Sequence, residues 1–186
     1  MTRLQTAFDA IDQANAADPH LQDGEPRELL YGQRMTAEQR ALYPDASEPL
    51  QIACRGQHVE RWLLPRDAYP MDRPGYLAWR TEQGRRHAAR VAGIMQAAGY
   101  APESIAHAEK MLTKQGIKRD PEVQALEDVA CFTFIRWYLG PFAETRDAEE
   151  LQRIVEKTAR KMSPQARSIA LTEFAIPEPF AAAFRA

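Results

Sequence analysis

Two adjacent acidic residues stand inside an otherwise apolar stretch. Glu127 and Asp128 lie in VQALEDVACFTFIRWYLG, residues 123–140, and an ionised carboxylate without a partner is costly to bury. Pro121 marks the expected start of a helix and Asp120 its N-cap, so both acids lie too deep in the helix to cap it. We therefore expect a buried cation beside them, either an Arg or Lys side chain or a metal. We expect the shorter Asp128 to point into the site.

Two of the four histidines could act together with these acids. His58 has Arg55 and Arg61 one helical turn away on either side, so an imidazole and positive charge share one face. His87 shares a helical row with apolar residues and is expected to face inward. For either histidine taken alone, a hydrogen-bonded core residue is the alternative. His20, in a polar connection, is expected to be solvated.

Basic side chains gather in the sequence around His58, and arginine forks bind phosphate or carboxylate bidentately. Further along the chain, Lys157 and Lys161 lie one turn apart, just before Ser163, the expected cap of a last helix and a predicted anion seat. The alternative is that these are solvated charges paired with nearby carboxylates. The candidate anion-binding residues are Arg55, Arg61, Arg66, Arg73, Arg80, Lys114, Lys157 and Lys161.

The elements that must position these residues are predicted to be helices, because glycine is scarce and apolar residues recur at helical spacing. We predict an all-α, single-domain bundle of about eight helices spanning residues 1–186. One expected helix spans 47–64, with Ser47 as its N-cap, and the tail from residue 175 is expected to be extended. The other expected helices lie near the N-terminus, after DGEP, and at 77–99, 101–116, 121–140, 147–162 and 163–174.

The segment 64–76 is rich in Pro, Arg and Tyr, and its prolines are incompatible with a helix. Aromatic residues are rare in disordered linkers, so we expect an ordered loop that covers the pocket.

Composition excludes several classes of function. With 186 residues and a net charge of −2, the chain suits one soluble domain without a general attraction to nucleic acid. Cys54 and Cys131 form no disulfide framework, which favours a reducing compartment. The N-terminus is not a signal peptide, and no window approaches the roughly 20 apolar residues of a membrane span. We expect a cytoplasmic protein without a membrane partner; oligomeric state leaves no signal in the sequence.

Three segments, HVERW, RRHAARVAGIMQAAGYAPESIAHAEKML and PEVQALEDVACF, resemble a degenerate HD-type phosphohydrolase core. The resemblance implies an HD-like helical bundle that holds a divalent metal (Mn, Zn, Fe or Mg), with Asp128 as the metal carboxylate and His58 and His87 as imidazole ligands. The His-Asp doublet of that superfamily is absent, since Val59 follows His58 and Ala88 follows His87. Over nearly the whole chain, and above all in WLLPRDAYPMDRPGYLAWR, the sequence is also similar to domain of unknown function family 4202 (DUF4202), for which no activity is established.

These observations predict metal-dependent hydrolysis of a small phosphorylated molecule, such as a nucleotide. Asp128 would hold the metal that activates a water, and Glu127 would act as a base or accept a histidine N–H. The alternative is a non-catalytic protein that binds an anionic metabolite, with the acids paired to Arg55 or Arg61. A di-iron enzyme that activates oxygen is disfavoured, because the sequence shows too few ligands for a dinuclear site. The net charge and the short basic–aromatic segment argue against an RNA-binding module.

Overall fold

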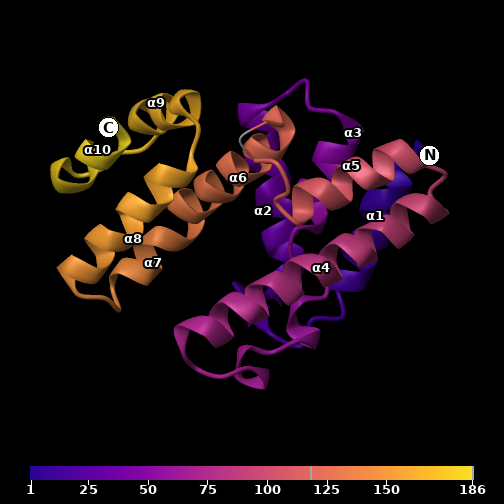
Figure 1. The fold of residues 1–186 in the computed structure, drawn as a ribbon, viewed down its shortest axis with the longest axis horizontal. Helices are drawn as coiled ribbons and strands as arrows, with labels where there is room; N and C mark the ends of the chain where they lie inside the picture. The colour runs from indigo at the N-terminus through magenta and orange to yellow at the C-terminus, as the bar shows by residue number, and fades with distance from the viewer. Residues whose placement is uncertain (118, 186) are drawn as a thin grey trace.

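The computed structural model describes residues 1–117 and 119–185, and they form an all-helical protein with one two-stranded sheet (Figure 1). The all-α class is confirmed, although the described residues form ten α-helices rather than about eight. The helices are α1 (Arg3–Asn15), α2 (Arg27–Leu42), α3 (Glu48–Gly56), α4 (Arg73–Ala97), α5 (Pro102–Leu112), α6 (Pro121–Thr133), α7 (Leu139–Ala143), α8 (Ala148–Lys161), α9 (Pro164–Glu173) and α10 (Glu178–Arg185). Two 3₁₀-helices, η1 (Arg61–Leu63) and η2 (Arg66–Ala68), precede α4, and a π-helix, η3 (Phe134–Tyr138), follows α6.

Two hydrophobic clusters hold the helices together. The larger one draws on α1 to α6, and the smaller one joins α6 to α8, α9 and α10. Figure 1 shows the second group, in orange and yellow, on the opposite side of α6 from α1, α4 and α5. Along α6, Val129 packs in the larger cluster and Phe132 in the smaller, so this helix has an apolar face on each side. Among the described residues, no helix combines the length and apolar character needed to cross a bilayer.

The predicted N-caps are confirmed. Ser47, Asp120 and Ser163 each accept a hydrogen bond from a backbone N–H in the first turn of the following helix, and each of these helices has a proline in its first turn. The helix that starts at Pro121 therefore begins where the sequence predicted.

The helix predicted for residues 47–64 ends at Gly56, so His58 lies in a turn and not on a helix. A Cβ at position 56 would lie 2.5 Å from a methyl carbon of Val91, so only glycine allows α3 to pack this closely on α4. Beyond this contact Glu60 takes a left-handed conformation, with φ of 53°, and reverses the chain into η1.

The segment 64–76 is shorter than expected, because α4 begins at Arg73 with Asp72 as its N-cap and Pro74 in its first turn. In the loop before α4, the side chain of Arg66 donates to the carbonyl oxygens of Tyr69 at 3.0 Å and Pro70 at 2.7 Å, and these bonds hold the loop in place.

The C-terminal tail is helical rather than extended. Its apolar residues Ala181 and Phe184 are buried against α8 and α9. Burial of this face stabilises a short helix that would be marginal alone, and periodicity over so few residues did not reveal it.

A small hairpin, unpredicted by the sequence, precedes α2. Strand β1 (Leu21–Gln22) pairs antiparallel with β2 (Glu25–Pro26), and Leu21 lies opposite Pro26. Asp23 and Gly24 both have positive φ, the conformation that an Asp-Gly pair favours in a two-residue hairpin turn. The hairpin brings the N–H of Arg27 to the carbonyl of His20 at 2.8 Å, so residues on both sides of it meet at the start of α2.

Candidate functional site

A cavity of about 620 Å³ opens beside the start of α2, and we call it the aromatic cavity. Its walls come from four parts of the chain: α2 with His20 before the hairpin, the turn after α3 with the following loop, α4, and α6 with η3. Its lining residues are His20, Arg27, Glu28, Tyr31, His58, Arg61, Trp62, Leu64, Pro65, Arg66, Trp79, Ala130, Phe134 and Tyr138. Its volume and mostly apolar lining are typical of small-molecule sites.

A carboxylate and an imidazole meet in this cavity. Oε2 of Glu28 lies 3.2 Å from Nδ1 of His58, and the ring of Tyr31 stacks on the imidazole at a centroid distance of 3.9 Å. Burial raises the pKa of Glu28, whereas burial and the charge of Arg61 hold the pKa of His58 well below its usual value. Both shifts favour the uncharged forms. The pair therefore favours an uncharged imidazole with one ring nitrogen facing the carboxyl group.

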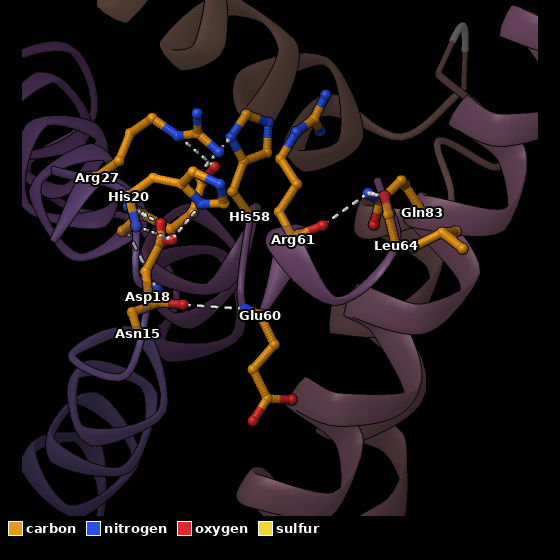
Figure 2. Close-up of polar contacts among 10 residues, drawn as sticks. Asn15, Asp18, His20, Arg27, His58, Glu60, Arg61, Leu64 and Gln83 are labelled. Carbon is orange, nitrogen blue, oxygen red and sulfur yellow. Dashed lines mark hydrogen bonds and ion pairs between the residues drawn. The ribbon is translucent and has the colours of Figure 1, made fainter. Parts of the chain in front are cut away.

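The end of α1 positions Glu28 and His58. The carboxylate of Asp18 accepts from the backbone N–H of Glu28 at 3.1 Å and contacts His20 Nδ1 at 2.9 Å. Asn15 donates to the carbonyl of Glu28 at 3.3 Å and accepts from the N–H of Glu60 at 3.0 Å. Figure 2 shows this network, with the side chains of His20, Arg27, His58 and Arg61 along one side of it. Two buried polar residues thus tie α1, α2 and the turn after α3 together.

Arg61 lies at the end of this turn with its backbone held firmly. Gln83 on α4 donates to the carbonyls of Arg61 and Leu64, each at 2.9 Å (Figure 2). Trp79 donates to the carbonyl of Leu64 at 3.0 Å. The guanidinium lies over the Trp79 ring at 4.7 Å, a cation–π arrangement. Burial lowers the pKa of Arg61. Among the described residues, this guanidinium has no hydrogen-bond or ion-pair partner, so its N–H groups remain available to an anion.

A family model described as "Domain of unknown function (DUF4202)" matches residues 5–183. The chain belongs to the DUF4202 family. No curated protein and no solved structure matches it. The description carries no activity, so the function of this DUF4202 chain must be argued from the site.

The two acids in the middle of α6 face different partners in this DUF4202 structure. Asp128, fully buried, accepts from the hydroxyl of Tyr43 at 2.7 Å, from Gln124 at 2.9 Å, and from both N–H and Oγ of Ser163 at 2.7 Å. Its partners are therefore hydroxyl and amide donors, not the cation or imidazoles expected from the sequence. The carboxylate joins α6 to the N-terminus of α9.

Glu127, not Asp128, has a cationic partner, and this partner is a half-buried lysine rather than the buried cation that was expected. The ammonium of Lys114 binds its carboxylate, and Nζ of Lys161 lies 3.8 Å away. The pair thus involves two lysines and neither of the arginines considered in the alternative reading. Glu127 and Asp128 do not line the aromatic cavity.

The structure brings His58 and His87 together, with ring centroids 5.9 Å apart, but it does not add Asp128 to them. Within residues 1–117 and 119–185, no group of three or more His, Cys, Asp and Glu side chains could hold one metal ion. The ligand set implied by the HD-type resemblance therefore does not assemble in this arrangement.

The eight basic candidates divide into three groups. Arg61 and Arg66 line the aromatic cavity, whereas Arg80 and Lys114 line a neighbouring cavity that also includes Arg61. Arg55 is an internal partner of Asp12, with Nε 2.7 Å from its carboxylate. The residues that line neither cavity are Arg55, Arg73, Lys157 and Lys161.

Sequence reasoning missed Glu28 and Tyr31 and assigned His20 to solvent. The side chain of His20 is indeed 55% exposed, but it lines the aromatic cavity and contacts Asp18. A signal for Glu28 was present, because it lies two helical turns before the fully buried Met35 on α2. Spacing of this kind places an acid on an inward face.

Proposed function

We propose that this protein binds a small phosphorylated molecule with a planar, apolar body in the aromatic cavity. The observation that carries the proposal is the Arg61 guanidinium, which lies partly buried over the Trp79 ring and has no carboxylate within ion-pair distance among the described residues, while Gln83 holds the backbone carbonyl of Arg61. A partly buried charge that the fold does not pair favours binding of a counter-ion. Phosphate fits, because an arginine fork matches its geometry.

The cavity walls support the planar body of the ligand. Tyr31, Trp62, Trp79, Phe134 and Tyr138 supply aromatic surface on several sides, and aromatic rings bind flat apolar groups by stacking or edge contacts. Arg27, at the mouth of the cavity and paired to Glu28 at 3.3 Å, adds a second positive charge. Arg66 contributes less to anion binding, because its guanidinium already donates to loop carbonyls.

Hydrolysis of the bound phosphate ester is a second candidate, and the Glu28–His58 pair favours it. With Nδ1 facing Glu28, the neutral imidazole can accept a water proton at Nε2 as the water oxygen attacks phosphorus. As the bond from phosphorus to the ester oxygen breaks, the imidazolium would give the proton on Nε2 to that oxygen, so the leaving group departs as an alcohol and the imidazole becomes neutral again. Arg61 would stabilise the charge that builds on the phosphoryl oxygens.

The metal ion implied by the HD-type resemblance stays a prediction, as does the HD-like arrangement of the helices. The described residues include no group of three His, Cys, Asp or Glu side chains that could hold one ion. Metal analysis of protein purified without a His-tag, with and without added manganese or zinc, tests whether an ion binds.

Calorimetric titration against nucleoside phosphates and sugar phosphates tests the proposal. We expect nucleoside phosphates to bind more tightly than sugar phosphates, since only they carry a planar ring. Arg61→Gln should weaken binding by about 1.5–3 kcal/mol, the range for a charge-assisted contact. Arg86→Gln is the matched control, because Arg86 is exposed and lines neither cavity.

Equal affinities of the two variants, or no binding by any compound in the panel, would overturn the binding proposal. Release of inorganic phosphate tests the hydrolytic candidate separately. A wild-type protein that binds but releases none, under conditions with and without divalent metal, would leave binding as the function.

A further inference from the structure

A second cavity, of about 510 Å³, lies on the other side of the His58–Arg61 turn from the aromatic cavity, and we call it the basic cavity. Both residues line both cavities. The remaining walls come from one face of α4 and from the turn that follows α5. None of the residues that line the basic cavity is acidic, whereas Arg61, Arg80, Arg85 and Lys114 are all basic.

The charges in the basic cavity are only partly neutralised by neighbours. Arg85 is paired with Glu82 in two hydrogen bonds, and Lys114 binds Glu127. For Arg61 and Arg80, the described residues offer no carboxylate partner within ion-pair distance. Arg80 lies over the ring of Tyr76 at 5.8 Å, which orients its guanidinium without neutralising it. Two positive charges therefore remain at one cavity.

A buried polar atom lies beside this cavity. His87 is only 4% exposed, and its Nε2, which is shielded from solvent, has no hydrogen-bond partner among the described residues. Such atoms are rare in folded proteins. His87 lines the basic cavity, so a ligand there reaches Nε2 when the imidazole or a neighbouring side chain moves.

The end of α5 places Lys114 at this cavity. Its φ of 56° is the left-handed conformation of a helix C-terminus, where the N–H groups of Lys114 and Gln115 donate to the carbonyls of Met111 at 3.0 Å and Lys110 at 2.9 Å. The ion pair with the buried Glu127 fixes the ammonium group of Lys114.

We propose that the basic cavity is a second phosphate site, which takes a compact di-anionic or polyphosphate group without an apolar body. Arg61 and Arg80 would bind its oxygens, Lys114 would add positive charge, and the His87 imidazole would donate to it after a small movement of the ring. Arg61 is also the anchor of the proposed aromatic-cavity ligand, so the two proposals share this residue, whereas Arg80 and Lys114 line the basic cavity alone. Two ligands could supply this group, because free diphosphate and the terminal phosphates of a ligand bound in the aromatic cavity present the same oxygens.

Calorimetric titration of the full chain with inorganic pyrophosphate tests this site. Arg80→Gln should weaken binding about tenfold, as expected for loss of one charge-assisted contact. The matched control is Arg86→Gln on the same helix, which should stay within about twofold of wild type because Arg86 is exposed and lies outside the cavity. The ¹⁵N signal of the His87 imidazole should shift on addition of pyrophosphate, a readout that does not require substitution of a buried residue.

Three outcomes would overturn the proposal: no binding of pyrophosphate to wild type, equal affinities of Arg80→Gln and Arg86→Gln, or a larger loss in Arg27→Gln than in Arg80→Gln. The last would place the anion in the aromatic cavity. Two further titrations identify the source of the phosphate.

If pyrophosphate and a nucleoside monophosphate bind at the same time, the ligand of the basic cavity is free diphosphate. Competition, with Arg80→Gln weakening a nucleoside diphosphate but not the monophosphate, supports one ligand that spans both cavities.

Discussion

Nδ1 of His58 lies 3.2 Å from Oε2 of Glu28, although 30 residues separate the two in the chain. The carboxyl group is buried and has a raised pKa, while the imidazole has a lowered pKa, so both groups favour their uncharged forms. This contact joins α2 to the turn after α3 at the wall shared by the two cavities. Its protonation determines how the protein responds to pH.

Replacing Glu28 should change how stability depends on pH in the weakly acidic range. The raised pKa means that the unfolded chain releases this proton at lower pH than the folded protein. Wild type therefore loses stability as pH rises from about 4.5 through the folded pKa of Glu28. Glu28→Gln cannot ionise, so its free energy of unfolding should rise relative to wild type over this window. Urea unfolding at pH 4, 5, 6 and 7 measures the difference, and a constant difference would contradict the buried, raised-pKa carboxyl.

His87 should make the protein less stable in acid. Burial and the nearby His58 and Arg61 lower its pKa well below 6.5, so the unfolded chain takes up a proton that the folded protein resists. Stability is lost as pH falls below about 6.5 towards the folded pKa, by up to about 1.4 kcal/mol per pH unit.

The variant His87→Gln removes this contribution, so its stability should fall less steeply than that of wild type between pH 6.5 and 5. If the free energy of unfolding falls equally steeply with pH in wild type and in His87→Gln, His87 does not resist protonation in the folded protein.

Asp128→Asn should destabilise the fold rather than abolish ligand binding. The fully buried carboxylate accepts four hydrogen bonds, and an amide would turn one acceptor oxygen into a donor facing other donors. We expect a loss of about 2–4 kcal/mol in the free energy of unfolding. Tyr43→Phe removes one of these donors and should cost about 1–2 kcal/mol. Below the melting temperature, affinity for the aromatic-cavity ligand should be unchanged, because Asp128 does not line that cavity.

Lys114→Gln should destabilise the protein more than Lys161→Gln. Glu127 is 5% exposed, and loss of Lys114 leaves its carboxylate with only the more distant ammonium of Lys161 at 3.8 Å. We expect about 1–3 kcal/mol for Lys114 and less than 1 kcal/mol for Lys161. Thermal unfolding of the double variant Lys114→Gln/Glu127→Gln provides a control, because removing both charges should recover part of the loss. Equal losses in the two single variants would mean that the two lysines share the carboxylate.

Local features of the structure followed from the sequence. The capping residues Ser47, Asp120 and Ser163, each followed closely by a proline, predicted where three helices start, because these signals act within one turn of the chain. The demand of the buried acids for partners was also readable, since burial of a charge has the same cost in any fold. It predicted a cation beside the two acids but assigned it to Asp128, whereas the structure gives the lysine partner to Glu127.

Which groups meet was decided by the tertiary structure. At Gly56, the last residue of α3, Val91, 35 positions later, leaves no room for a side chain, and the turn that follows places His58 beside Glu28. Packing of α2 and α9 against α6 places Tyr43 and Ser163 at Asp128, where the sequence had suggested histidines. Helical spacing shows which face of a helix is buried. Which residue of another helix lies against that face depends on how the helices pack together.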